Sequence, residues 1–320
     1  MKNVRRVAIA LVILLGLTLT VLGCESPSGS AGGDADPKGP ITVSSMIDSE
    51  GALLGQMMLL LLEADGFQVN DRTELGTPDI LRQALESGEV DLVLDYTGSG
   101  QYYHDVEDTA PWSNAEEGYA LTRQLDLEAN DIHWLTPAPA NNTEMLALRR
   151  PFAETHGIVD MYDFAEYVNA GGEVKLISSA SFAENIKGLL GYEEAYGFTL
   201  RGDQMILLSA GNTAEMLKAL VEGTNNVNVS LVYGTDGALE DMDITIIEDP
   251  KGIPPVYLPT PVLRGEMYEQ YPEIEEILAP AFESLTREVL QDLNARVAFA
   301  GEAPRDTALE YLTTHGFLSD

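Results

Sequence analysis

Residues 41–94 read ITVSSMIDSEGALLGQMMLLLLEADGFQVNDRTELGTPDILRQALESGEVDLVL, a segment in which strand patterns alternate with helix patterns. It opens with a short strand, and residues 52–64 are apolar enough and long enough for a buried helix. Residues 67–73 alternate like a strand, and the Thr-Pro pair at 77–78 has the residue types that begin a helix. Residues 91–94 form the next buried strand. This β-α-β-α-β order predicts an α/β sheet with helices on its faces.

The alternation continues through the rest of the chain. Further strands are predicted at 143–148, 174–177, 204–208 and 227–233, and helices at 161–168, 213–220, 275–282, 286–298 and 305–315. Two segments, 137–140 and 236–243, are predicted to cross between two lobes, with a binding site between the lobes. We therefore expect a first lobe formed by residues 41–138 and 237–320 and a second lobe formed by residues 139–236.

The N-terminus has the pattern of a secretory leader. Three basic residues precede an apolar run at 7–21, which is short for a transmembrane helix, and the chain's one cysteine, Cys24, follows Val-Leu-Gly. The pattern resembles a bacterial lipobox, which implies diacylation of Cys24; an uncleaved membrane anchor is the alternative. Residues 1–23 are thus predicted as a signal peptide and 24–40 as a flexible tether. The protein is predicted to be anchored to the membrane, outside the cytoplasm.

The composition argues against several classes of function. Eighteen basic residues against 52 acidic ones give a formal net charge of −34, which disfavours nucleic acid and anionic membrane surfaces as partners. The four histidines lack metal-ligand spacing, and no nucleophile elbow or phosphate-binding loop is present. We therefore predict no catalytic residue, no metal and no cofactor. An enzyme on the same fold remains the alternative from another class.

Five short motifs together resemble a known family. They are Ser-Met-Ile-Asp-Ser-Glu-Gly at 45–51, Ser-Gly-Glu-Val-Asp at 87–91, Asp-Tyr-Thr-Gly at 95–98, Asn-Asn-Thr at 141–143 and Tyr-Gly-Thr-Asp-Gly at 233–237. In this order they resemble the substrate-binding component of osmoprotectant ABC importers of the glycine betaine/carnitine/choline class. Residues 134–143 are similar to a subgroup that binds betaine poorly. The resemblance implies a two-lobed type II periplasmic-binding-protein fold with a ligand cleft between the lobes, permease and ATPase partners, and a quaternary ammonium ligand. A monomer is expected, and a receptor-type binding module is a further alternative.

The resemblance also implies an aromatic cage. Tyr96 and Tyr233 stand where the family uses tyrosines as cage walls, which hold a quaternary ammonium by cation–π attraction. Cage members have an aromatic residue where this chain has Glu144. A further cage tyrosine is replaced by Leu217, and basic groups that hold a betaine carboxylate are replaced by Met46 and Asn185.

These changes remove positive charge and add a negative one. We therefore expect a cation without a carboxylate, such as choline, to be preferred; the alternative is that Glu144 faces solvent and the protein binds betaine weakly. Other residues predicted to line the cleft, with turn or hinge roles as alternatives for the last two, are Ser45, Asp48, Thr97, Asn142 and Asp236. Tyr102 is expected to pack on the surface, with a position at the mouth of the cleft as the alternative.

Overall fold

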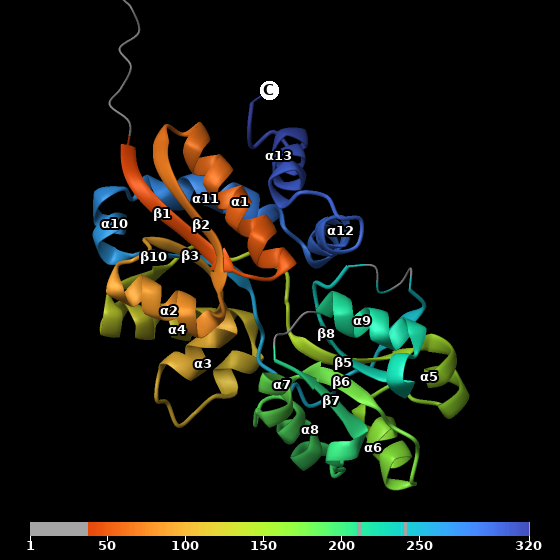
Figure 1. Cartoon of the computed structure of the whole chain (residues 1–320). Helices are drawn as coiled ribbons and strands as arrows, with labels where there is room; N and C mark the ends of the chain where they lie inside the picture. The colour runs from red at the N-terminus through yellow and green to blue at the C-terminus, as the bar shows by residue number, and fades with distance from the viewer. Residues whose placement is uncertain (1–37, 210–212, 238, 240–241, 320) are drawn as a thin grey trace, which may run out of the picture. The chain divides into compact units, whose positions relative to one another are not determined.

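The structure is a computed structural model that describes residues 38–209, 213–237, 239 and 242–319. The predicted signal peptide, the lipobox cysteine Cys24 and most of the predicted tether lie outside the described residues. The chain forms two five-stranded sheets, each with helices packed against it (Figure 1). We call the first sheet with its helices lobe 1 and the second sheet with its helices lobe 2.

Lobe 1 has the strand order β2-β1-β3-β10-β4. The strands β1, β2 and β3 are parallel, whereas β10 runs antiparallel to β3 and β4. The bounds of the strands are β1 Lys38–Met46, β2 Phe67–Gly76, β3 Leu92–Tyr96, β4 Ile132–Trp134 and β10 Pro259–Arg264. The helices are α1 Ser49–Ala64, α2 Pro78–Ser87, η1 Thr97–Ser99, α3 Gly100–Tyr103, η2 Ala110–Ser113, α4 Ala115–Asn130, α10 Gly265–Gln270, α11 Glu273–Ser284, α12 Arg287–Ala298 and α13 Pro304–Thr314.

Lobe 2 repeats the arrangement with the order β7-β6-β8-β5-β9, in which β5 is antiparallel to both β8 and β9. The strands are β5 Glu144–Arg149, β6 Leu176–Ser179, β7 Met205–Leu208, β8 Val229–Tyr233 and β9 Ile244–Ile246. The helices are α5 Arg150–His156, α6 Met161–Asn169, α7 Ala180–Glu184, α8 Leu189–Tyr196, η3 Gly202–Gln204, α9 Thr213–Glu222 and η4 Thr224–Asn226.

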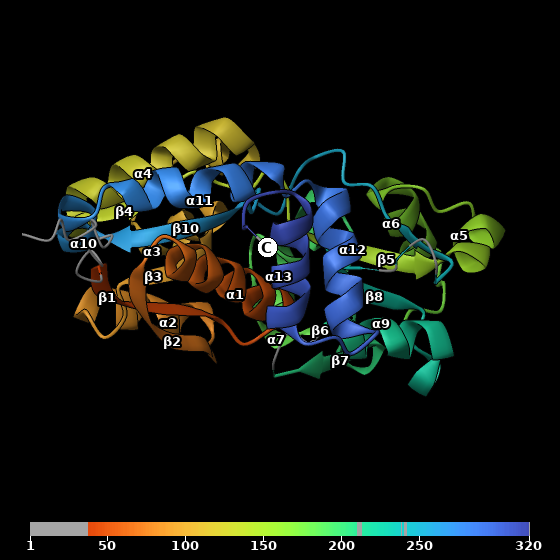
Figure 2. The same cartoon turned by 90° about the horizontal axis from the view of Figure 1, so that it is seen from above.

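The helix predicted at 52–64 is the centre of lobe 1. It is α1, whose side chains are buried along most of its length because the sheet lies on one side and the C-terminal helices lie on the other. Figure 2 shows α12 and α13 beside it. An apolar surface all around a helix is stable only when both faces are covered. The Asp48 side chain caps the helix by accepting a hydrogen bond from the Gly51 amide at 2.8 Å.

The second crossing between the lobes differs from the prediction. We placed it at 236–243 and ended lobe 2 at residue 236, but β9 pairs with β5 in the second sheet. The chain returns to lobe 1 only after β9, through residues 247–258. The reason is that 236–243 is polar and turn-rich by sequence, whereas the short strand after it completes the edge of lobe 2 and buries Ile244 and Ile247 in its core. In the described part of the chain, no helix is both long enough and apolar enough to span a bilayer.

Candidate functional site

Glu144 and Tyr233 lie side by side where two strands of lobe 2 meet lobe 1. Glu144 begins β5, Tyr233 ends β8, and the two residues are paired across the antiparallel ladder. The Tyr233 hydroxyl approaches Glu144 Oε1 at 3.5 Å, and the Tyr192 hydroxyl donates to the Glu144 carbonyl oxygen at 3.4 Å. Glu144 is only 9% exposed. From the residues that the structure describes, its buried carboxylate receives one long contact.

Two tyrosines from outside lobe 2 lie near enough to this carboxylate for its charge to raise the pKa of their hydroxyls. Tyr102 comes from α3 and Tyr257 from the crossing at 247–258, and their hydroxyls are 3.4 Å apart. The Tyr257 ring lies directly on Gly98, where a Cβ atom would be 2.7 Å from it. The Asn185 amide of lobe 2 donates to the Tyr102 hydroxyl at 2.8 Å and so joins the two lobes.

We call this group the tyrosine cluster; its members are Glu144, Tyr102, Tyr192, Tyr233 and Tyr257. Burial raises the pKa of all four phenols, and the negative charge of Glu144 adds to the rise. Burial also raises the pKa of Glu144 to about 7, opposed only by the Tyr233 hydrogen bond. Among the described residues, no basic side chain forms an ion pair with this carboxylate. Buried negative charge beside aromatic faces is the environment that a small organic cation requires.

A second buried carboxylate, Glu50, has the opposite surroundings. Its Oε1 accepts hydrogen bonds from the Tyr96 hydroxyl at 2.7 Å and the Asn142 amide at 3.0 Å. Its Oε2 accepts from the Asn294 amide at 2.6 Å and from the Thr235 hydroxyl. We call these five residues the Glu50 joint. Every acceptor position that faces the protein is occupied, so Glu50 has little capacity left for a ligand.

Several residues predicted to line a cleft make hydrogen bonds or core contacts within the protein. The Tyr96 hydroxyl is bound to Glu50, and its ring packs in a cluster of lobe 1 with Met46, which is buried. The Ser45 hydroxyl accepts from the Glu74 amide, which fixes β2 against β1. The Thr97 hydroxyl donates to the Val256 carbonyl and accepts from the Leu258 amide. Their contacts are thus within the protein, and a role as ligand walls stays a prediction.

The remaining predicted residues hold turns and crossings. Asp48 caps α1, and Asp236 accepts from the Tyr233 amide and from the Thr213 hydroxyl, both at 2.7 Å. Burial raises the pKa of Asp236 to about 7. The Asn142 side chain donates to Glu50 and accepts a hydrogen bond from the backbone amide of Thr235. These contacts agree with the hinge alternative for this residue.

Sequence reasoning missed Tyr257 and Tyr192 and placed Tyr102 on the surface. Tyr102 is 52% exposed, but its hydroxyl contacts both Tyr257 and the other lobe. Tyr257 follows two prolines in a crossing without periodicity, and Tyr192 lies in a short helix with other aromatic neighbours. Neither residue is near a crossing predicted from the sequence, so no local signal marked them. Leu217, which replaces a cage tyrosine by resemblance, is buried in the core of lobe 2.

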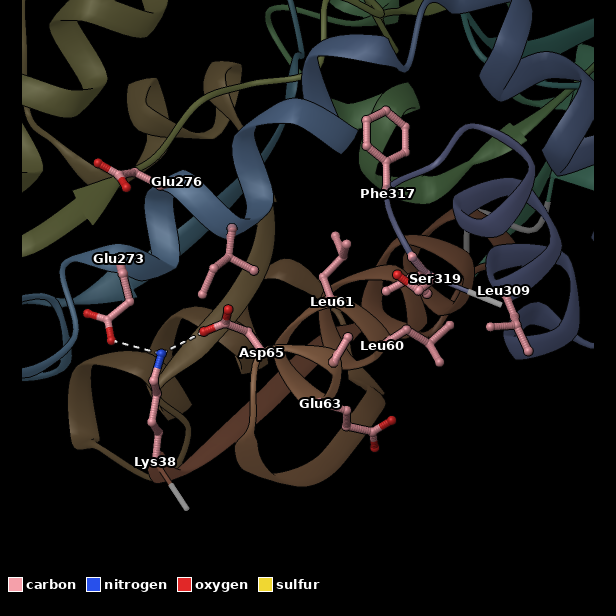
Figure 3. A pocket seen from close by; sticks show the side chains of 13 residues that line it. Lys38, Leu60, Leu61, Glu63, Asp65, Glu273, Glu276, Leu309, Phe317 and Ser319 are labelled. Atoms are coloured by element: carbon pink, nitrogen blue, oxygen red, sulfur yellow. Dashed lines mark hydrogen bonds and ion pairs between the residues drawn. The ribbon is translucent and has the colours of Figure 1, made fainter. Parts of the chain in front are cut away.

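A surface depression elsewhere in lobe 1 has none of these features. It has a volume of about 1030 Å³ and lies between the end of α1, α11 and the C-terminal residues (Figure 3). At one side Lys38 forms ion pairs with Asp65 at 2.6 Å and Glu273 at 3.2 Å. Its one lysine is paired with two carboxylates at the surface, and no residue of the tyrosine cluster lines it. Within the described ranges, no group of side chains is arranged to hold a metal ion.

Two α/β lobes, joined by two crossings and meeting at a group of polar and aromatic side chains, define the class of solute-binding proteins. Residues 39–314 match the family model described as the substrate binding domain of the ABC-type glycine betaine transport system, and the chain belongs to this family. It is therefore a substrate-binding protein of an ABC-type importer, a class that works outside the cytoplasm. The predicted family and the predicted two-lobed α/β fold are both confirmed.

Individual relatives agree with this assignment. The chain is 41% identical to the glycine betaine-binding protein YehZ of Escherichia coli, over 87% of this chain and 91% of that protein. It is 32% identical to a glycine-betaine-binding protein of Pseudomonas aeruginosa, over 85% of this chain and 86% of that one. The solved structure of apo YehZ superimposes with a TM-score of 0.69, 40% identity, and coverage of 88% of this chain and all of that chain.

Proposed function

We propose that this protein captures a small quaternary ammonium compound at the tyrosine cluster and delivers it to the permease of its importer. The observation that carries the proposal is Glu144, a buried carboxylate without a basic partner among the described residues. A desolvated negative charge attracts a cation strongly, and the faces of Tyr102, Tyr233 and Tyr257 supply cation–π attraction of about 0.5–2 kcal/mol each. A ligand that cannot donate a conventional N–H hydrogen bond is held best by such a group.

The same carboxylate favours a cation over a zwitterion. Two of the relatives are named for glycine betaine, which makes that compound the natural reference ligand. Its carboxylate would need a donor close to Glu144, and the donors available in the cluster are the neutral Asn185 amide and the tyrosine hydroxyls. Bringing two carboxylates together without a basic group between them is unfavourable. We therefore propose that choline, or another organic cation without a carboxylate, binds more tightly than glycine betaine.

Calorimetric titration with choline and with glycine betaine tests the proposal. We expect choline to bind more tightly than glycine betaine. The substitution Glu144→Gln should weaken choline binding by about tenfold, which corresponds to about 1.4 kcal/mol. Glu154→Gln, an exposed carboxylate on α5 of the same lobe, is the matched control and should change nothing. Tighter binding of glycine betaine, together with no effect of Glu144→Gln, would contradict the cation preference. Binding of neither compound would contradict the ligand class itself.

We further propose that the protein transports without chemical change and acts as a lipid-anchored monomer with permease and ATPase subunits. The lipobox-like sequence before Cys24 supports the anchor, and family membership supports transport. Mass spectrometry of the mature chain from cells should find a diacylated residue 24, and an unmodified chain would contradict this. Recovery of unaltered choline after prolonged incubation checks the absence of turnover. Loss of choline uptake when the gene is deleted separates transport from a purely sensory role.

A further inference from the structure

The Glu50 joint collects groups from both lobes onto one carboxylate. Glu50 itself lies in the first turn of α1 of lobe 1, and Tyr96 ends β3 of the same lobe. Asn142 lies in the crossing that leads into β5, and Thr235 follows β8, so both come from the lobe 2 side. Each lobe therefore contributes hydrogen-bond donors to Glu50, and the carboxylate oxygens lie between them.

The helix α12 closes the joint from a third direction. Its Leu290 and Leu293 belong to the core of lobe 1, whereas Asn294 donates both to Glu50 and, at 2.9 Å, to the Thr235 carbonyl oxygen. Gln291 of the same helix donates to the Gly234 carbonyl oxygen at 3.0 Å. A Cβ atom at Gly237 would lie 2.4 Å from the backbone of α12, so the turn after β8 rests directly on that helix.

The arrangement is unfavourable for stability alone. Glu50 is 6% exposed, and among the described residues it has no basic partner to neutralise it. A buried charge without a counter-charge costs several kcal/mol unless hydrogen bonds offset the loss of water, and an apolar replacement is often more stable. The carboxylate fixes the positions of four separate segments relative to one another, because its two oxygens accept hydrogen bonds from a donor on each segment.

We infer that Glu50 is a positioning residue that fixes the orientation of lobe 2 relative to lobe 1. By our proposed function, it thereby also sets the distances within the tyrosine cluster, whose members come from both lobes and from a crossing. Glu50 acts through these groups and does not touch the ligand itself. In its absence both lobes stay folded, but their relative orientation becomes variable.

Distance measurements between the lobes in the absence of ligand test this inference. Spin labels at Glu128→Cys on α4 and Glu154→Cys on α5, in full-length protein in detergent with Cys24→Ser, report one distance by pulsed electron resonance. We expect Glu50→Gln to broaden or shift the distance distribution, because one of its two acceptor oxygens becomes a donor group that faces other donors. A distribution identical to that of the unsubstituted joint would overturn the inference. This readout needs no ligand, so its outcome is independent of the proposed cargo.

Two matched asparagines separate positioning from simple stabilisation. Asn294 belongs to the joint, whereas Asn228 is also buried and its side chain bonds to Lys175 and Glu173 of lobe 2. Both Asn294→Ala and Asn228→Ala should lower the melting temperature, but only Asn294→Ala should broaden the interlobe distance and weaken choline binding, by about fivefold. Equal distance distributions in the two variants would overturn the inference. Should Glu50→Gln fail to fold, Thr235→Val removes one donor at nearly constant shape and serves the same test.

Discussion

Glu50 and Glu144 are both buried glutamates at the junction of the lobes, and neither has a basic partner among the described residues. Glu50 accepts four hydrogen bonds from four different segments, whereas Glu144 has one contact, at 3.5 Å, to its carboxylate. A carboxylate whose acceptor capacity is filled by the protein holds the protein together. A carboxylate that is desolvated but nearly unpaired has acceptor capacity left, which by our proposal serves a bound cation.

The largest expected effect is the pH dependence of cation binding. The pKa of Glu144 is raised by burial to about 7, so the carboxylate is ionised above pH 7 and progressively neutral below it. Since the neutral variant Glu144→Gln is expected to bind choline about tenfold more weakly, protonation of Glu144 should cost about the same, and choline affinity should fall about tenfold between pH 8 and pH 5. Titrations across this range check the slope. In Glu144→Gln the profile should be flat, and a steep profile in that variant would assign the titration to another group.

Removal of the Glu144 charge should also stabilise the folded protein. Because the folded pKa is raised above the ordinary value, the buried charge lowers the free energy of unfolding as pH rises from about 4.5 to 7. Glu144→Gln should therefore raise the free energy of unfolding by about 1–3 kcal/mol at pH 8 and change it little at pH 4. Urea titrations at the two pH values measure the difference. If Glu144→Gln were less stable at pH 8, the Glu144 carboxylate would have to be held by protein hydrogen bonds, as the Glu50 carboxylate is.

Two tyrosine-to-phenylalanine changes compare the two carboxylates directly. Tyr96→Phe removes a 2.7 Å hydrogen bond to the buried Glu50 and should lower the free energy of unfolding by about 1–3 kcal/mol. Tyr233→Phe removes only the 3.5 Å contact to Glu144 and keeps the aromatic face, so we expect a loss below about 0.5 kcal/mol. The same urea titrations measure both variants. If both variants lost the same free energy of unfolding, Glu50 and Glu144 would not differ in how the protein binds them.

The smallest expected effect concerns the support of Tyr257. In Gly98→Ala the new methyl group would lie 2.7 Å from the Tyr257 ring and 2.9 Å from the Val256 carbonyl oxygen, so the ring has to move. We expect choline affinity to fall about fivefold, or about 1 kcal/mol. Gly202→Ala is the control, because no atom lies within 4 Å of its new methyl group. Unchanged affinity in Gly98→Ala would remove Tyr257 from the proposed site.

The local sequence pattern was sufficient to predict the α/β architecture. The apolar run at 52–64 could only be a buried helix, and the alternation of strands and helices predicted the two α/β lobes. The order of five motifs predicted the family, which the family match confirms. The second crossing was placed too early, because a three-residue strand such as β9 leaves almost no periodic signal.

Sequence patterns could not predict the hydrogen-bond partners of the polar residues at strand ends. The family resemblance placed Tyr96 and Glu144 near a site, but it did not show whether protein groups would satisfy their hydrogen bonds. Glu50 meets Asn294 across 244 positions of sequence, and Tyr102 meets Tyr257 across 155. Periodicity records which face of an element is buried; only the packing of α12 on the turn after β8 and the path of the chain through 247–258 bring these groups within hydrogen-bond distance.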